Sequence, residues 1–247
     1  MEIRALSWNL FHGRAESGRA GRELFREFAS VLAEADWDLA LLQECPPRWS
    51  ESLASECDAT VAHRVLTSRN WLAPLRSALA RRNPDLLGSW EGGSNLTVVR
   101  GRLAKCRFGE RRSLLLRRFP ERRRMAFVRL SKGLCIANVH ASKRRALAEG
   151  DVLLAAERAV AWADGSPLIF GGDLNLRPER SRVLAKLKEQ FGLGGAIPRS
   201  IDHILARGVV LEKPADRWPA TRREVDSQRG RLRLSDHSPV EGVFRLR

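Results

Sequence analysis

Residues 167–175 read PLIFGGDLN, a short apolar run followed by two glycines, an aspartate, a leucine and an asparagine. The pattern predicts a short buried strand over 167–170 that ends in polar side chains. Side chains two apart in an extended segment point the same way, so Asp173 and Asn175 share one face while Leu174 packs inward. A carboxylate there can orient and deprotonate a water, and a neutral amide can donate to a phosphoryl oxygen. Taken alone, the segment fits an ordinary turn after a strand equally well.

Polar residues also lie at one end of five other predicted strands. A carboxylate at the end of an apolar strand needs a partner, because burying an unpaired charge is costly. A hard cation such as Mg²⁺ would be such a partner, and an aspartate can also orient a neighbouring imidazole. Each site alone is compatible with a structural role. The five are Asn9 after strand 2–9, Gln43-Glu44 after DLALLQ (38–43), Asn138-Val139-His140 closing GLCIAN, Asp202 in SIDH, and Asp236-His237 in SDHSP (235–239).

The remaining hydrophobic pattern predicts helices near both ends and a strand-rich middle, which indicates helices flanking stacked sheets. We expect helices over 18–35, 48–57, 74–82, 146–163 and 179–190. We expect strands over 2–9, 38–43, 95–100, 103–108, 113–118, 124–131, 133–139, 167–170, 201–206, 209–213 and 238–246. Two basic segments, 65–94 and 213–235, lack clear periodicity and contain Trp71, Trp90 and Trp218. No repeat or low-complexity linker divides the chain, which favours one domain over residues 1–247.

The six motifs follow one another along the chain in the order WN, QE, NVH, GDLN, IDH and SDHSP. In combination they resemble the endonuclease/exonuclease/phosphatase superfamily, which includes pancreatic-type deoxyribonucleases, apurinic endonucleases, neutral sphingomyelinases and inositol-polyphosphate phosphatases. The resemblance runs from residue 3 to residue 244. It implies an α/β fold, a four-layered α/β/β/α sandwich of two mixed, mainly antiparallel sheets packed face to face with helices outside. It also implies a phosphoesterase site at one edge of the sandwich.

The resemblance further implies roles for individual residues. Glu44 matches the principal ligand of Mg²⁺, for which Mn²⁺ could substitute. Asn9 and Asp236 match residues that assist it, directly or through water. Asp173 matches the residue that orients or deprotonates the attacking water, and Asn175 matches the one that holds the phosphate.

Histidines complete the set that the resemblance implies. His237 matches the imidazole at the scissile phosphate, Asp202 the carboxylate that orients it, and His140 a second histidine that contacts phosphate. His203 alternates away from Asp202 and is expected to pack. Further candidates for phosphate or substrate contact, each of which could instead be an ordinary surface or structural residue, are Asn138, Arg124, Arg177, Lys143 and Arg144.

The sequence departs from relatives in three places. Apurinic endonucleases usually carry a tyrosine where NVHAS stands here and a lysine shortly after the QE motif. This chain has no tyrosine, and Cys45-Pro46-Pro47 follows Glu44, which argues against an abasic-site enzyme. The second acidic partner of secreted deoxyribonucleases matches no particular residue between 45 and 137.

The charge balance points to an anionic partner. The net charge is +15, and 38 of the 44 basic residues are arginines, whose planar side chains suit phosphate. Basic proteins concentrate polyanions at their surface, which favours nucleic acid as a partner. A GC-rich genome would produce the same arginine bias without any functional demand.

Three features of the sequence indicate the compartment in which the protein works. Cys45, Cys57, Cys106 and Cys135 are widely spaced, which fits buried thiols better than a zinc site or a disulfide framework. No apolar run approaches the roughly 18–20 residues of a membrane span. The first residues, MEIRALSWNL, do not resemble a signal peptide. We therefore expect a cytoplasmic monomer without stable membrane insertion.

Three hypotheses of function remain open from the sequence. The favoured one is a divalent-metal-dependent phosphodiesterase, an endo- or exonuclease acting on DNA or RNA. The second is a phosphatase or phosphodiesterase that acts on an inositol phosphate, a phospholipid or another small phosphoester. The third is a catalytically idle, basic module that binds nucleic acid.

Overall fold

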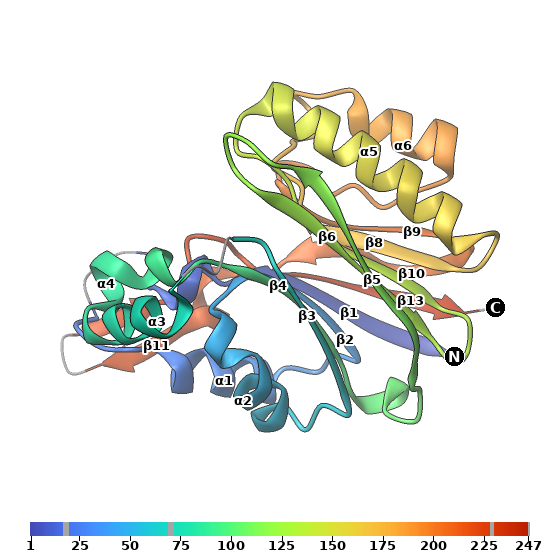
Figure 1. The fold of residues 1–247 in the computed structure, drawn as a ribbon. Coiled ribbons are helices and arrows are strands. Elements are labelled where there is room, and N and C mark those ends of the chain that lie inside the picture. Colours follow the sequence, from blue (N-terminus) through green and yellow to red (C-terminus); the bar gives the residue numbers. More distant parts are fainter. Residues whose placement is uncertain (17–19, 69–71, 228–229, 247) are drawn as a thin grey trace.

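Two β-sheets packed face to face form the centre of the molecule in the computed structural model, which describes residues 1–16, 20–68, 72–227 and 230–246 (Figure 1). The first sheet has the strand order β10 (Val209–Arg217), β13 (Val240–Leu246), β1 (Glu2–Asn9), β2 (Leu39–Cys45), β4 (Ser94–Val99) and β3 (Val61–Leu66). The second has the order β5 (Phe108–Arg117), β6 (Arg123–Leu130), β7 (Cys135–His140), β8 (Leu168–Asp173) and β9 (Asp202–Arg207). Only the β1–β2 and β7–β8 neighbours run parallel, so both sheets are mixed and mainly antiparallel.

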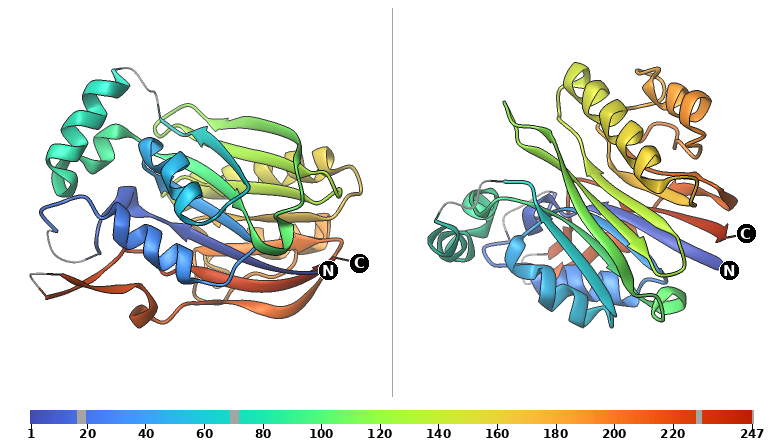
Figure 2. Two further views of the ribbon diagram at one scale, coloured as in Figure 1. Left: turned by 90° about the horizontal axis from the view of Figure 1, so that it is seen from below. Right: turned by 45° about the vertical axis from the view of Figure 1, so that its right-hand side comes forward.

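Helices cover the two outer faces and complete four layers. The first sheet is covered by α1 (Phe25–Glu34) and α2 (Ser50–Glu56), and the second by α5 (Arg145–Ala163) and α6 (Val183–Phe191). Two further helices, α3 (Ala73–Arg82) and α4 (Pro84–Leu87), lie beside the sandwich (Figure 2). The remaining elements are the hairpin β11 (Glu224–Ser227) and β12 (Gly230–Arg233) and the short 3-10 turns η1 (Phe11–Gly13), η2 (Pro47–Trp49), η3 (Gly88–Glu91), η4 (Gly101–Leu103) and η5 (Ala220–Arg223).

Alternating side chains along the strands build three hydrophobic layers. Between the sheets, aliphatic residues such as Ile3 and Leu41 meet Ile169 and Ile204. On the outer face of the first sheet, Trp8 packs on Phe28 of α1, with ring centroids 5.1 Å apart. The fully buried face of α5 is mostly alanine (Ala148, Ala155, Ala156 and Ala159), and such small side chains let a helix approach a sheet closely. The four-layered sandwich expected from the sequence is confirmed.

Several element predictions are wrong in detail. Residues 103–107 form η4 and a turn, and β5 begins only at Phe108. The helix expected over 74–82 is confirmed as α3, but the segments 65–94 and 213–235 hold further regular structure that was not predicted, namely α4 and the β11–β12 hairpin. The strand β3 was not predicted, since VAHRVL places polar His63 and Arg64 in an edge strand whose apolar pattern is short.

None of the helices in the described ranges has the length and apolar character of a membrane span. All four cysteines are free and buried, as the sequence predicts.

Candidate active site

Strand register gathers the predicted site residues at one edge of the sandwich. His140, Asp173 and Asp202 lie side by side across β7, β8 and β9. In the other sheet, Asn9 ends β1 beside Gln43 of β2. The two glycines before Asp173 make this close packing possible, since a Cβ at Gly172 would lie 1.9 Å from the carbonyl oxygen of Val139. The result is a cavity of about 240 Å³ lined by Asn9, Phe11, Glu44, Lys143, Asp173, Asn175, Asp236 and His237.

Asp173 lies at the buried centre of this cavity. Its Oδ2 accepts a hydrogen bond from the side-chain Nδ2 of Asn9 at 3.0 Å. Its Oδ1 accepts a hydrogen bond from the backbone N–H of Asn175 at 3.1 Å. Burial and the nearby charge of Asp202 raise the pKa of Asp173 to about 7. The carboxyl group can therefore exchange a proton near neutral pH.

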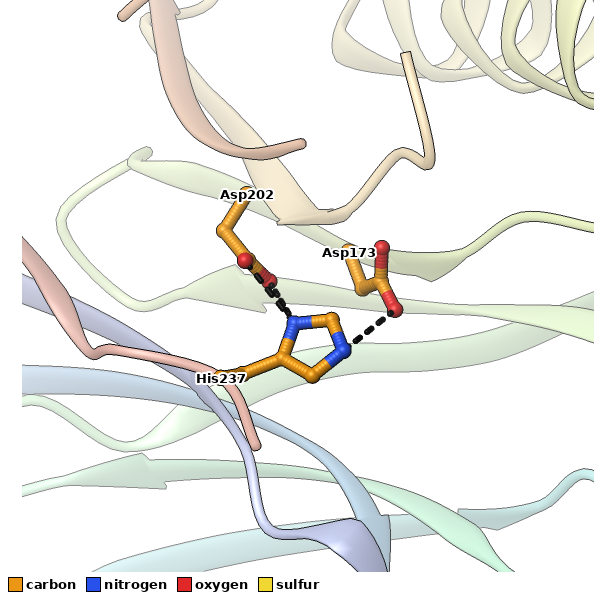
Figure 3. Close-up of side chains that lie close together, drawn as sticks. All are labelled: Asp173, Asp202 and His237. Atoms are coloured by element: carbon orange, nitrogen blue, oxygen red, sulfur yellow. Dashed lines mark hydrogen bonds and ion pairs between the residues drawn. The ribbon is translucent and has the colours of Figure 1, made fainter. Parts of the chain in front are cut away.

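His237 and Asp202 form a hydrogen-bonded pair beside Asp173 (Figure 3). His237 Nδ1 lies 2.9 Å from Asp202 Oδ2, and its Nε2 lies 3.9 Å from Asp173 Oδ2. Burial alone would lower the pKa of His237, but the charge and hydrogen bond of Asp202 outweigh it and raise that pKa to about 10. Nδ1 of the protonated ring donates to Asp202, so Nε2–H faces the cavity.

Glu44 enters the cavity because β2 bulges at its end. The pairing of β2 with β4 shifts register between Leu42 and Cys45, and Glu44 adopts a positive φ of 48°. Gln43 continues the alternation of Leu39 and Leu41 and points between the sheets, where its Nε2 donates to Asn138 Oδ1 at 2.9 Å. Glu44, which is 8% exposed, directs its carboxylate to the rim instead.

Two imidazoles face the Glu44 carboxylate. His12 Nε2 lies 3.2 Å from Glu44 Oε2, and His140 Nε2 lies 3.8 Å from Glu44 Oε1. Burial lowers the pKa of His12, and burial followed by the charge of Arg123 lowers that of His140 well below its usual range. His12 was not predicted, because it lies in the turn η1 with φ of 54° and not at a strand end.

Arg123 sets the protonation pattern of His140. Its Nη1 lies 3.1 Å from His140 Nδ1, and a guanidinium can only donate, so Nδ1 must accept. The ring proton of neutral His140 is then on Nε2, 3.4 Å from Asp173 Oδ2. Among the described residues this buried Nε2 has no hydrogen-bond partner, which leaves it free to donate into the site.

Some predicted contacts lie elsewhere. Arg124 points to the opposite side of β6 and donates to Ser113, so its neighbour Arg123 is the arginine at the site. Asn138 is fully buried between the sheets, where its Nδ2 donates to the carbonyl oxygens of Leu42 and Leu96, and it cannot contact substrate. Arg144 is exposed at the start of α5 and does not line the cavity.

The other predicted residues fall into three groups. Lys143 lines the cavity, and Arg177 lines a neighbouring pocket together with Asn175. His203 is buried and bonded to backbone groups of Ile197 and Leu176, as expected of a packing residue. Trp218 is 4% exposed and donates to Glu241, Trp90 is 56% exposed, and Trp71 lies outside the described residues.

The donor set fits a divalent cation. Glu44 and Asp173 bring two carboxylates together, while His12 and His140 are held neutral by burial and give no compensating charge. Asn9 Oδ1 accepts one hydrogen bond, from Phe11, and keeps a second lone pair. Asp236, with its side chain 43% exposed, adds a carboxylate at the rim. Such oxygen donors suit a hard cation. One oxygen each of Asp173 and Asp202 and a His237 ring nitrogen also lie within 4.8 Å of one another.

The chain is similar to known proteins in its sequence profile and in its fold. The sequence profile of the endonuclease/exonuclease/phosphatase family matches residues 6–237. No curated protein matches the sequence. Among solved structures, a mannosyl-6-phosphatase from Bacteroides thetaiotaomicron is similar at 16% identity, with 98% of this chain and 99% of that chain covered and a TM-score of 0.68.

Two other solved structures are similar over nearly the whole chain. A family protein from Bacteroides thetaiotaomicron is 15% identical, with 100% and 96% of the two chains covered and a TM-score of 0.68. TDP2 from Caenorhabditis elegans is 15% identical, with 99% of this chain and 74% of that chain covered and a TM-score of 0.63. At such identities the likeness shows the shared fold.

Proposed function

Because the chain belongs to the endonuclease/exonuclease/phosphatase family, whose members hydrolyse phosphoester bonds, we propose that it is a divalent-metal-dependent phosphodiesterase that cleaves nucleic acid. The observation that carries this proposal is one cavity lined by Glu44, Asp173 and His237 together. A proton acceptor, a cation ligand and an imidazole donor therefore face the same small volume. Hydrolysis at phosphorus needs these three functions in one place.

Asp173 is the proposed general base. Its pKa of about 7 lets it accept the proton of an attacking water near neutral pH. The N–H groups of Asn9 and Asn175 that bond its two oxygens fix its orientation. Water held against this carboxylate would approach a phosphorus atom bound in the cavity.

The imidazoles are proposed to stabilise charge on the phosphate oxygens. Protonated His237, oriented by Asp202, directs its Nε2–H into the cavity, and neutral His140, oriented by Arg123, directs its Nε2–H toward Asp173 at the border of the cavity. Asn175 donates one N–H to the Ala141 carbonyl oxygen and keeps a second for phosphate. Donors fixed before the reaction stabilise developing charge with little reorganisation.

Glu44, with Asn9 and Asp236 assisting, would hold a divalent cation, which would supply positive charge beside the phosphate oxygens. We propose Mg²⁺, with Mn²⁺ as a substitute, since carboxylate and amide oxygens are its usual protein ligands. Nucleic acid is the proposed substrate because the chain carries +15 net charge and basic side chains line the surroundings of the cavity.

The proposal is tested with a panel of metals and substrates. Purified protein is incubated at low salt with Mg²⁺, Mn²⁺ or EDTA and with DNA, RNA, sugar phosphates and inositol phosphates. We expect nucleic acid to be cleaved only with metal, and Asp173→Ala to lower the rate by about 10²–10⁴-fold. Asp173→Asn keeps the shape and serves where the alanine variant unfolds, as judged by circular dichroism. Failure to cleave any nucleic acid under all metals would disprove the proposal.

Hydrolysis of a small phosphomonoester is a second candidate function. A pocket of about 430 Å³ next to Glu44 is large enough for a sugar-sized group, and a mannosyl-6-phosphatase shares the fold. Turnover of sugar or inositol phosphates in the same panel, with nucleic acid left intact, would favour this function over the first.

A further inference from the structure

Two basic pockets flank the candidate active site. One, of about 430 Å³, lies between the β5–β6 turn and the start of β4 and shares Glu44 with the active-site cavity. The other, of about 550 Å³, lies between the start of α5 and the segment after β8 and shares Lys143 and Asn175 with that cavity. Within the described residues, none lines both flanking pockets. The active-site cavity therefore shares lining residues with each flanking pocket and lies between them.

We name the flanking spaces by the elements that build them. The turn pocket takes its cations from the β5–β6 turn, and the helix pocket takes them from the start of α5 and the segment after β8. The cations of the turn pocket are Arg118, Arg122 and Arg123. The cations of the helix pocket are Lys143, Arg145, Arg177 and Arg180.

Apart from Arg123, these cations differ from many other arginines of the molecule, because they form no ion pair with a carboxylate among the described residues. Elsewhere arginines pair with carboxylates, as Arg117 does with Asp151 and Arg48 with Glu23. Arg123 of the turn pocket likewise pairs with Glu121. Over the described chain, no carboxylate oxygen lies within 4.0 Å of a side-chain nitrogen of Arg118 or Arg122, nor of any of the four cations of the helix pocket.

Two of these cations, one in each pocket, are held by hydrogen bonds to backbone carbonyl groups. Arg122 donates to the Ser68 carbonyl oxygen at 3.3 Å, and Arg145 donates to the Arg180 carbonyl oxygen at 3.4 Å. Gathering like charges without counterions is unfavourable, and a phosphate in each pocket would relieve the repulsion. Arginine also binds phosphate through two parallel hydrogen bonds. Each pocket thus has the chemistry of a phosphate subsite.

One aromatic side chain adds evidence for a nucleotide on the turn side. Phe119 lines the turn pocket and is 82% exposed, between Arg118 and Arg122 in sequence. An exposed aromatic ring flanked by cations is the arrangement on which bases of single strands stack while their phosphates are held.

We propose that the substrate is a nucleic-acid strand bound across the active site, with one flanking phosphate in the turn pocket and the other in the helix pocket, so that the enzyme cuts internal linkages. In the reaction water forms a bond to phosphorus, one P–O ester bond breaks, and a phosphomonoester and a hydroxyl group are the products. This inference rests on the proposed function, since it concerns the same active site. It adds that phosphates are recognised on both sides of the scissile one.

The test measures what each flanking phosphate contributes. The substrates are a dinucleoside monophosphate, which has only the scissile linkage, and the same compound with a phosphate at its 5′ end, at its 3′ end or at both. We expect each added phosphate to raise kcat/KM by about tenfold or more, as charge-assisted hydrogen bonds do. A covalently closed circular strand, which has no ends, is expected to be cut.

Two double variants assign the pockets. Arg118→Ala/Arg122→Ala should abolish the gain from the phosphate at one end, and Arg177→Ala/Arg180→Ala the gain at the other. The matched control is Arg26→Ala/Arg158→Ala, which removes two exposed arginines of the outer helices. Because each gain is a ratio of kcat/KM values for one protein, partial loss of folded enzyme does not affect it.

Binding supplies a second measurement without catalysis. Fluorescence anisotropy of a labelled oligonucleotide in EDTA gives the dependence of affinity on salt. Each pocket variant should reduce the slope of log K against log salt by about 0.7 for every phosphate that its pocket no longer binds, and the control should not.

The outcomes separate the inference from the proposed function. Cleavage of linear substrates only at their ends, with circles left intact, overturns the inference and leaves the phosphodiesterase proposal standing. Equal effects of both pocket variants on both end phosphates, or equal effects of the control, also overturn it. Absence of any cleavage of nucleic acid overturns both proposals.

Discussion

At the scale of single residues, Asp202 determines the charge of His237. Replacing it by asparagine removes the negative charge that raises the pKa of His237, so that pKa should fall from about 10 toward the ordinary 6.5. The ring would then lose part of its charge near neutral pH and its fixed orientation. We expect kcat/KM of Asp202→Asn to fall by about 10²–10⁴-fold.

The check combines kinetics with an NMR titration of the imidazole in metal-free protein. Glu157→Gln, on the exposed face of α5, is a control for the loss of one carboxylate. An unchanged pKa of His237 in Asp202→Asn would show that another group holds its proton.

Arg123 controls the protonation of His140. Its positive charge helps to lower the pKa of His140, after the larger effect of burial, and its hydrogen bond keeps the ring proton on Nε2. Arg123→Ala should raise the pKa of His140 and mix the two ring tautomers, which nitrogen NMR shifts report. The adjacent Arg124→Ala is the matched control, because Arg124 donates to Ser113 on the exposed edge strand. Identical spectra for the two variants would contradict the assignment.

The same pair shows why the sequence predicted some site residues and not others. Glu44, Asp173 and His237 could be found because each lies beside a strong apolar strand or in a recognisable motif. In the run RRRMAF, however, a shift of one residue moves every side chain to the other face, so the choice between Arg123 and Arg124 needs the register. His12 carries no such signal in a short turn.

At the scale of elements, Asn138 joins the two sheets through buried hydrogen bonds. From β7 it reaches the carbonyl oxygens of Leu42 in β2 and Leu96 in β4, and it accepts from Gln43. Asn138→Ala should lower the free energy of unfolding by about 1–3 kcal/mol, since it removes buried hydrogen bonds. Urea denaturation measures this, with Ser113→Ala on edge strand β5 as the control. A loss no larger than that of the control would refute the bridging role.

Element prediction succeeded for strands that are apolar on both faces and for the edge strands β9 and β10, but it missed β3 and part of β5. Strands β2 and β8 are buried throughout, and their mostly apolar sequences predict them directly. Edge strands β3 and β5 carry many polar residues, because one side or face meets water, so β3 was missed and β5 was found only in its leucine-rich half. Pairing partners, not local sequence, define such strands.

At the scale of the whole molecule, burial protects the thiols. Burial raises the pKa of Cys57 to about 11 and also raises that of Cys135, so both stay protonated at pH 8. The thiolate is the reactive form, and all four cysteines are buried. We expect an alkylating reagent at pH 8 to leave the native protein unmodified and to label four sites after denaturation, as counted by mass spectrometry. Rapid labelling of folded protein would mean that the core opens frequently.

The bulged end of β2 sets stability against activity when the protein is engineered. Glu44 adopts a positive φ of 48°, a conformation that costs a non-glycine residue about 1–2 kcal/mol. Glu44→Gly and Glu44→Ala both remove the carboxylate, but only glycine relieves the backbone, so the glycine variant should be about 1 kcal/mol more stable by differential scanning calorimetry. Directed evolution that rewards heat resistance alone would therefore drift toward robust but inactive descendants, and selection rounds need an activity screen to counter that drift.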